Sequence, residues 1–112
     1  SAPTLVRVES DVPGRARPVA VAVAPAVANE QSEVLLDGSA STGGGTAKLR
    51  YRWSQVAGPW VPLDDAREAL AEFTPRLSGL YVFELEVDDG TTRSAPSTVG
   101  VMVFPPTTGG RR

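Results

Sequence analysis

The stretch that decides the fold is GLYVFELEVDDG, residues 79–90. Within it, large apolar side chains recur at every second position, a period that is typical of a strand with one buried face. The side chains predicted to point inward are Tyr81, Phe83, Leu85 and Val87. Asp88-Asp89-Gly90 follows directly and is a strong turn signal. We therefore predict that residues 80–87 form the longest strand of the protein and end in a tight turn.

Residues 48–55 repeat this alternation. The side chains predicted to point inward are Leu49, Tyr51 and Trp53, and those predicted to point outward are Arg50, Arg52 and Ser54. Three large apolar groups on one face predict a central strand.

Shorter segments extend the pattern in both directions. Residues 19–24 place three valines, Val19, Val21 and Val23, on one face and three alanines on the other. Val34 and Leu36 are predicted to point inward from a strand over residues 33–37, and Val99, Val101 and Val103 from one over residues 98–104. Residues 65–70 are predicted to form a single helical turn. The whole chain gives about seven short strands with frequent turns, which favours an all-β sandwich of two sheets.

The composition limits the number of domains and the kinds of catalytic and metal sites that the chain can form. The chain has 112 residues, 11 Gly, 10 Pro, no Cys and no His, and its net charge is −2. One small domain is expected, with residues 1–17 as an extension or linker, 18–104 as the sandwich and 105–112 as a second linker. Without His and Cys the sequence offers no imidazole base, thiol nucleophile, disulfide or zinc ribbon. The charge disfavours nucleic acid as a partner, and no apolar run is long enough for membrane insertion.

Several motifs together resemble a known family, the polycystic kidney disease (PKD) domain. The motifs are Pro18-Val19-Ala20-Val21, Val34-x-Leu36-Asp37-Gly38-Ser39-Ala40-Ser41, Tyr51-x-Trp53-x-Gln55-x-x-Gly58-Pro59, Phe73-Thr74-Pro75 and Gly79-x-Tyr81-x-Phe83-x-Leu85-x-Val87-x-Asp89-Gly90. The resemblance covers residues 17–104 and implies an immunoglobulin-like antiparallel β-sandwich from a secreted or surface protein. Many members carry Trp-x-Phe-Gly-Asp-Gly, which is replaced here by the Trp-x-Gln-x-x-Gly-Pro variant. Fold is transferred more safely than function across such a difference.

Four aromatic residues are predicted to be structural. Tyr51, Trp53 and Phe83 belong to the inward faces of the two long strands, where sandwich domains keep large rings between their sheets. Tyr81 follows Gly79 at the start of a strand and matches the tyrosine corner, whose hydroxyl group bonds to nearby backbone.

Trp60 lies outside the alternating pattern, in a predicted loop after Gly58-Pro59. An exposed tryptophan on a loop is a common platform for a sugar ring or for an apolar side chain of a partner. The simpler interpretation, which we favour from the sequence, is that the ring folds back to close the end of the sandwich beside Leu63 and Leu70.

A charged sheet face is the second candidate contact surface. The two long strands are antiparallel neighbours in immunoglobulin-like topology, so Arg50 and Arg52 are predicted to face Glu84 and Glu86. Solvated ion pairs are the simpler role for these groups, and a partner surface is the alternative.

Acidic residues near strand ends raise the question of calcium, which needs several clustered oxygen ligands. The candidates are Asp37, Asp64, Asp65, Asp88 and Asp89. Because aspartates of this kind commonly stabilise turns, we predict no metal site and no cofactor.

The sequence thus favours a non-catalytic extracellular or surface module of a larger protein, acting as a spacer and binding another protein or a glycan. The alternative is an accessory substrate-binding domain of a secreted hydrolase. Expected partners are neighbouring domains of the same chain and one protein or glycan ligand. The isolated domain is expected to be monomeric, with no catalytic residues.

Overall fold

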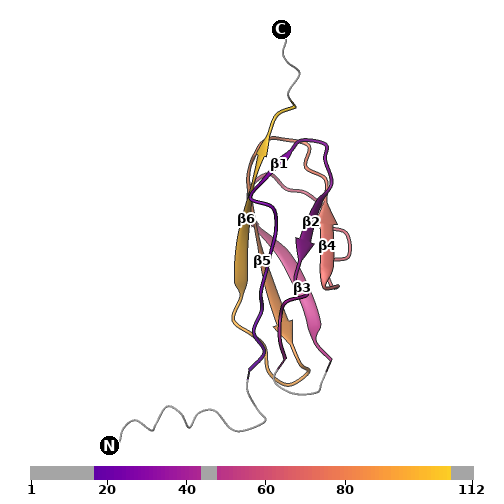
Figure 1. The fold of residues 1–112 in the computed structure, drawn as a ribbon, viewed down its shortest axis with the longest axis vertical. Coiled ribbons are helices and arrows are strands. Elements are labelled where there is room, and N and C mark those ends of the chain that lie inside the picture. Colours follow the sequence, from indigo (N-terminus) through magenta and orange to yellow (C-terminus); the bar gives the residue numbers. More distant parts are fainter. Residues whose placement is uncertain (1–16, 44–47, 107–112) are drawn as a thin grey trace, which may run out of the picture.

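The computed structural model describes residues 17–43 and 48–106. In this part of the chain six strands and no helix are present (Figure 1). They are β1 (Val27–Asn29), β2 (Val34–Asp37), β3 (Arg50–Ala57), β4 (Leu70–Phe73), β5 (Gly79–Asp88) and β6 (Ser97–Phe104). A four-stranded sheet in the order β1-β6-β5-β3 packs against the pair β2-β4. The all-β sandwich is confirmed, with six strands in place of about seven.

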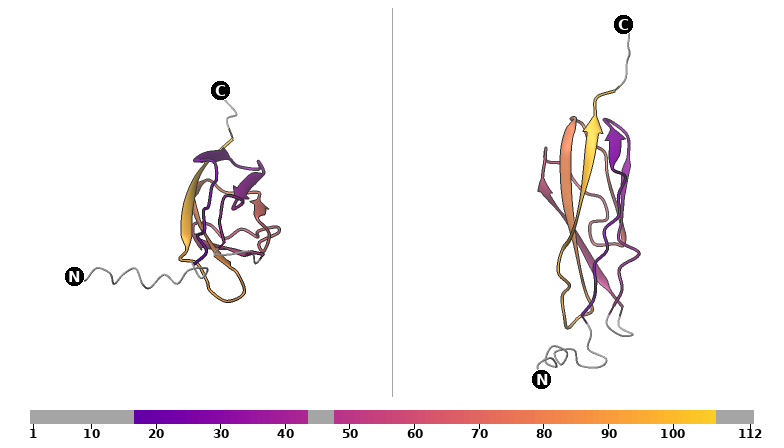
Figure 2. Two further views of the ribbon diagram at one scale, coloured as in Figure 1. Left: turned by 60° about the horizontal axis from the view of Figure 1, so that its bottom comes forward. Right: turned by 60° about the vertical axis from the view of Figure 1, so that its left-hand side comes forward.

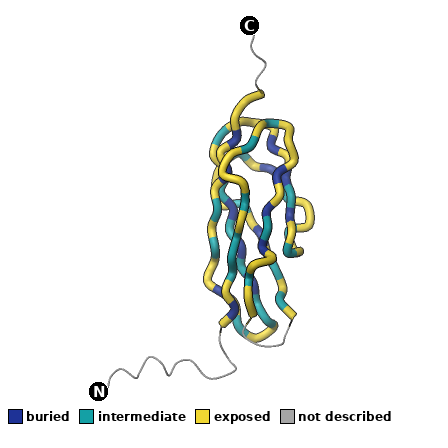
Figure 3. Tube along the Cα trace, in the orientation of Figure 1, coloured by how far each residue is buried: buried dark blue, intermediate teal, exposed yellow. Residues whose placement is uncertain are grey.

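The core lies between the two sheets (Figure 3). Strand β5 supplies its centre, because Tyr81, Phe83, Leu85 and Val87 are each at most 1% exposed. The ring of Phe73 on β4 lies with its centroid 4.7 Å from that of Phe83, which joins the sheets through an aromatic contact. The inward face predicted for the longest strand is therefore confirmed.

Strand β3 is an edge strand, which corrects the prediction that it is central. It pairs antiparallel with β5 on one side only. On its other side the backbone N–H of Trp53 donates to the carbonyl oxygen of Ala66 at 2.8 Å. A non-strand segment therefore covers the edge at this position, which limits pairing with foreign strands.

The charged faces of β3 and β5 meet in a register that differs partly from the prediction. Arg52 lies opposite Glu86, as expected from the alternation, whereas Arg50 lies opposite Asp88 and Glu84 lies opposite Ser54. Glu84 therefore has no arginine opposite it, and Asp88, the last residue of β5, is the acidic partner of Arg50.

The alanine-rich segment differs from a regular strand. Val19 and Val23 are 54% and 51% exposed, while Ala20, Ala22 and Ala24 pack against the core. Its alanine side chains are small enough to lie close to the core. Its backbone forms two isolated bridges and donates to two serine hydroxyl groups, and it does not pair continuously with a strand. For example, the N–H of Ala22 donates to the Ser97 hydroxyl oxygen at 3.1 Å. The segment runs along the sandwich as an extended strap with two isolated bridges (Figure 2).

Two further sequence predictions have different outcomes. Residues 65–70 form no helix; the N–H of Glu68 donates to the carbonyl of Asp65, whose positive φ of 57° marks an irregular turn.

Residues 1–16 and 107–112, the bulk of the predicted extension and linker, lie outside the described residues. In residues 17–43 and 48–106, no helix has the length and apolar character needed to cross a membrane.

Replacing Trp53 by alanine is expected to lower the free energy of unfolding by about 3 to 5 kcal/mol, because its ring is only 3% exposed. Thermal or denaturant unfolding measures the loss. A loss of a few tenths of a kcal/mol would show that the ring contributes little to the core.

The register predicts which charges interact across the sheet. A double-mutant cycle on Arg52 and Glu86 is expected to give a coupling of about 0.2 to 1 kcal/mol, because the two residues are direct cross-strand partners. A cycle on Arg50 and Glu84, which are not paired, serves as the control. Equal coupling in both cycles would contradict the register.

Candidate functional site: the Trp60 loop

The candidate site begins with the packing of Trp53 on β3. Its ring lies in the core, and its indole N–H donates to the carbonyl oxygen of Glu68 at 3.2 Å. The backbone N–H of Trp53 donates to Ala66, so both of its N–H groups are bonded to the turn that follows the Trp60 loop. This pair of bonds fixes the returning chain against β3.

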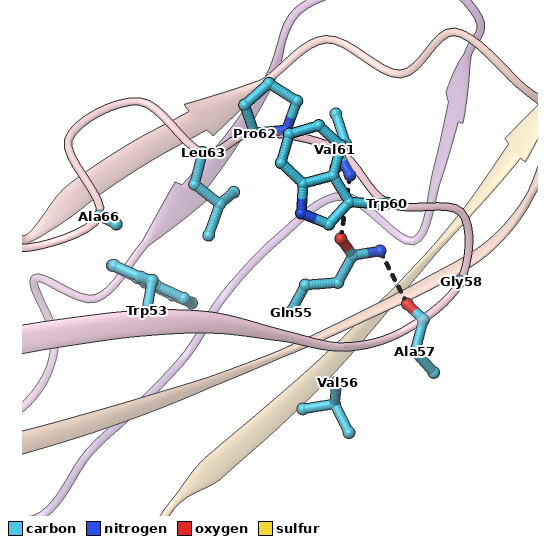
Figure 4. A pocket seen from close by; sticks show the side chains of 10 residues that line it. All are labelled: Trp53, Gln55, Val56, Ala57, Gly58, Trp60, Val61, Pro62, Leu63 and Ala66. Carbon is cyan, nitrogen blue, oxygen red and sulfur yellow. Dashed lines mark hydrogen bonds between the residues drawn. The ribbon is translucent and has the colours of Figure 1, made fainter.

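Gln55, on the same face of β3, fixes the loop itself. Its side-chain amide donates to the carbonyl oxygens of Ala57 (3.0 Å) and Pro59 (2.7 Å). Its amide oxygen accepts the backbone N–H of Val61 at 3.1 Å. Figure 4 shows this side chain reaching up beneath the loop. One side chain thus satisfies three backbone groups of the connection and holds it in a single path.

Gly58 allows the loop to pass close to β5. Its φ is 101°, and a Cβ at this position would collide with the carbonyl oxygen of Leu80 and lie 2.9 Å from the Cα of Tyr81. A residue with a side chain would have to move the loop or the strand. The spacing Trp-x-Gln-x-x-Gly-Pro therefore specifies the path of this connection.

This path leaves Trp60 81% exposed, while the next residue, Val61, is 7% exposed and joins the core. The favoured interpretation from the sequence, in which Trp60 closes the end of the sandwich, is wrong. Val61 takes the inward position instead. The inward position of Val61 has no signal in the sequence, because Val61 lies in a short run between Pro59 and Pro62 without alternation.

The indole of Trp60 stands between two hollows. One, of about 480 Å³, is lined by Gln55, Val56 and Leu63 among others. The other, of about 800 Å³, lies toward Arg76 and Leu77 on the loop between β4 and β5. Trp60 lines both hollows, and of the two the larger is the more apolar. We call Trp60 and its two hollows the Trp60 surface.

The other predicted structural aromatics lie as follows. Tyr81 and Phe83 are buried, and the hydroxyl of Tyr81 donates to the carbonyl oxygen of Leu77 at 2.7 Å. This bond has the form of the tyrosine corner and ties the loop before β5 to the sandwich. Tyr51 is half-buried and packs against the edge of the core.

The charged candidates lie elsewhere on the molecule. Arg50 and Arg52 are exposed and Glu84 and Glu86 are half-buried, all on the outer face of β3 and β5. Arg50 begins β3, whereas Trp60 follows the end of that strand. The structure therefore does not bring the charged residues and Trp60 into one site.

The aspartates stabilise turns. Asp37 accepts the N–H and hydroxyl of Ser39 at 2.8 and 2.6 Å, and these bonds lower the pKa of Asp37 below its ordinary value. Asp89 accepts the N–H groups of Thr92 and Thr91, which likewise lower its pKa. Asp88 accepts the N–H of Gly90.

Glu72 on β4 is a further acidic group with a shifted pKa, and it is not among the candidates predicted from the sequence. Glu33 raises the pKa of Glu72 by a side-chain hydrogen bond and by like charge, with smaller contributions from burial, Asp64 and Asp65. Within the described ranges, no group of three or more acidic, His or Cys residues has the arrangement of a metal site.

Comparison with known proteins places this geometry in a family. The family model described as "K319L-like, PKD domain" matches residues 25–103. No curated protein sequence matches the chain.

Solved structures give the same result. The PKD domain from the KIAA 1837 protein is 29% identical, with a TM-score of 0.67 over 83% of this chain and 92% of that one. The PKD domain of human KIAA0319 is 17% identical, with a TM-score of 0.66 over 86% and 88%.

A third similar structure is a nucleoside hydrolase-related hypothetical protein from Saccharophagus degradans that is associated with carbohydrate metabolism. It is 22% identical, with a TM-score of 0.61, and the match covers 82% of this chain but 26% of that protein. The family match over residues 25–103, together with the pinned Trp-x-Gln-x-x-Gly-Pro connection, shows that this chain belongs to the PKD domain family.

Proposed function

We propose that this PKD domain is a non-catalytic module of a secreted or surface protein, which spaces neighbouring domains and binds a protein or glycan through the Trp60 surface. Family membership supports the spacer or interaction role, since domains of this kind are generally found in extracellular or surface proteins. The single observation that supports the binding role is the exposure of Trp60, 81%, on a loop that is fixed from below.

Preorganisation of the Trp60 loop favours binding. An exposed indole on a mobile loop would lose conformational entropy on binding, and that loss would weaken the complex. Here Gln55 holds the backbone on both sides of Trp60, through Pro59 and Val61, so the loop is already ordered. Tryptophan in such a position is the residue type that most often dominates binding energy at interfaces.

The surroundings of Trp60 suit a ligand with both apolar and polar groups. Leu77 and Pro59 line the larger hollow with apolar surface, while Arg76 and Asp64 bring charge to it. A sugar ring stacked on the indole and an apolar side chain of a protein both fit this combination. In either case the module is expected to act as a monomer beside its neighbouring domains.

A second candidate function is an accessory substrate-binding domain of a secreted hydrolase. The specific support is the similarity to one part of the Saccharophagus degradans protein, which is associated with carbohydrate metabolism. In that case the ligand of the Trp60 surface would be the polymer substrate of a catalytic domain elsewhere in the protein. Selective binding of a polysaccharide would favour this function over a role in protein recognition.

Binding through the Trp60 surface can be tested by screening the chain against a glycan array and a peptide phage library, then measuring affinities by calorimetry. Trp60→Ala is expected to weaken the selected ligands by about 2 kcal/mol or more, roughly thirtyfold, because the ring is the central contact. Phe104→Ala, which removes another exposed ring, is the matched control. Full affinity in Trp60→Ala for every ligand would refute the proposal.

Gln55→Ala tests the ordering of the loop separately from the contact that Trp60 makes with a ligand. It should lower the free energy of unfolding by about 1 to 3 kcal/mol, because the N–H of Val61 loses its partner close to the core. It should also weaken ligand binding while Trp60 itself is unchanged. Unfolding curves and calorimetry measure the two effects. If Gln55→Ala binds as tightly as the wild type, the pinned loop is not needed for recognition.

A further inference from the structure

A group of arginines gathers at the end of the four-stranded sheet where β3 begins. Residues 17–43 and 48–106 contain six arginines, and four of them line one hollow of about 220 Å³. Two carboxylates line it as well. The six charged groups are Arg50, Arg52, Arg67, Arg93, Glu86 and Asp88. We call this the arginine hollow.

Three separate segments build the arginine hollow. Arg50 and Arg52 point outward from β3 because side chains two apart share a face of a strand, about 6 to 7 Å from each other. Arg93 follows the turn after β5, and its backbone forms an isolated antiparallel β-bridge with that of Asp88. Arg67 belongs to the turn beside the edge of β3, next to Ala66, whose carbonyl accepts the Trp53 N–H.

Positive charge exceeds negative charge in the arginine hollow. Four guanidinium groups face two carboxylates there, although the net charge of the whole chain is −2. The arginines are exposed, whereas Glu86 and Asp88 are half-buried. A fifth arginine, Arg17, lies alongside and donates to the backbone carbonyl of Arg93 at 3.2 Å. The carboxylates of this surface are therefore too few to pair with all of its arginines.

We propose that the arginine hollow binds the sulfate or carboxylate groups of an anionic polysaccharide. Guanidinium groups hold oxyanions through paired N–H bonds and are only weakly hydrated, so several of them around one hollow favour such groups. A second hollow of about 570 Å³ adjoins the first and shares Arg52, Arg67, Arg93 and Glu86 with it. Glu84 lines it as well, so three arginines face two glutamates there. The shared arginines allow successive charged groups of one polymer to be bound along β3.

An acidic peptide is the competing ligand, and the edge of β3 argues against it. An extended peptide gains much of its affinity by adding a strand to a free sheet edge. Here the N–H of Trp53, midway along β3, is already bonded to Ala66. A peptide therefore gains no strand addition at this position and, like a charged polysaccharide, would be held through its anionic groups alone. This proposal is independent of the Trp60 surface, which lies beyond the other end of β3.

Calorimetric titration of the whole chain with dextran sulfate, polygalacturonate and uncharged dextran tests the proposal. We expect binding to one or both charged polymers and none to dextran, which distinguishes sulfate from carboxylate recognition. The double variant Arg67→Gln/Arg93→Gln is expected to weaken binding at least tenfold. Both residues lie outside the strands and are exposed, and thermal melting checks that the variant remains folded.

Two matched variants separate a specific site from general attraction. Adding Glu33→Gln/Glu72→Gln to Arg67→Gln/Arg93→Gln returns the net charge of the chain to −2 through residues that line neither the arginine hollow nor the Trp60 surface, and should not restore binding. Arg67→Lys/Arg93→Lys keeps the charge but loses the paired N–H groups, and should weaken binding about threefold or more. Restored binding in the charge-compensated variant would overturn the proposal, as would unchanged binding in the lysine variant.

Polyglutamate is the remaining arm of the experiment. If it binds as tightly as the charged polysaccharides and is equally sensitive to Arg67→Gln/Arg93→Gln, the ligand is an acidic protein segment and the polysaccharide assignment is wrong. Absence of binding to both charged polymers also overturns the proposal. Trp60→Ala should leave these affinities unchanged, so failure here is distinguishable from failure of the Trp60 surface.

Discussion

The pairing of β3 with β5 is the constraint on which the rest of the structure depends. It places Trp53 opposite Leu85 and so brings the largest ring of β3 against the centre of the core. Because alternate residues of a strand share a face, Gln55 also points to the inner side and meets the loop that returns over it. A register shift between Gln55 and Ala57 then redirects the chain into the Trp60 loop.

The same pairing produces the charged surface. When Trp53 points inward, Arg50 and Arg52 must point outward, next to the acidic side chains of β5. A slip of one residue would bury an arginine and expose the tryptophan, so hydrophobic burial fixes the position of the charges. The polar face of the sheet is thus a consequence of core packing, and its arginines remain accessible to solvent.

The residues of the Trp-x-Gln-x-x-Gly-Pro motif have structural roles. Trp53, Gln55 and Gly58 each have a structural task in the connection after β3, whether burial, hydrogen bonding or close approach of the backbone. Trp60, on which the proposed binding rests, comes immediately after the motif. Family membership can therefore be recognised from residues that specify the path of the loop, while the proposed binding relies on a residue that the loop presents.

The sequence by itself determined the strands with the clearest alternation. The inward faces of β5, of β6 and of β3 from Tyr51 to Trp53 follow from a period of two, which is a local property of the chain. The bond from Tyr81 to Leu77 was also foreseeable, because it spans only four residues.

Tertiary structure decided the rest, because the deciding contacts join residues far apart in sequence. The edge position of β3 depends on the covering turn at Ala66, and the inward orientation of the alanines on how closely residues 18–24 approach the core. Trp60 is exposed because the chain has one inward position there and Val61 fills it. The arginine hollow exists only because two turns bring Arg67 and Arg93 to the face of β3, and no local pattern records that meeting.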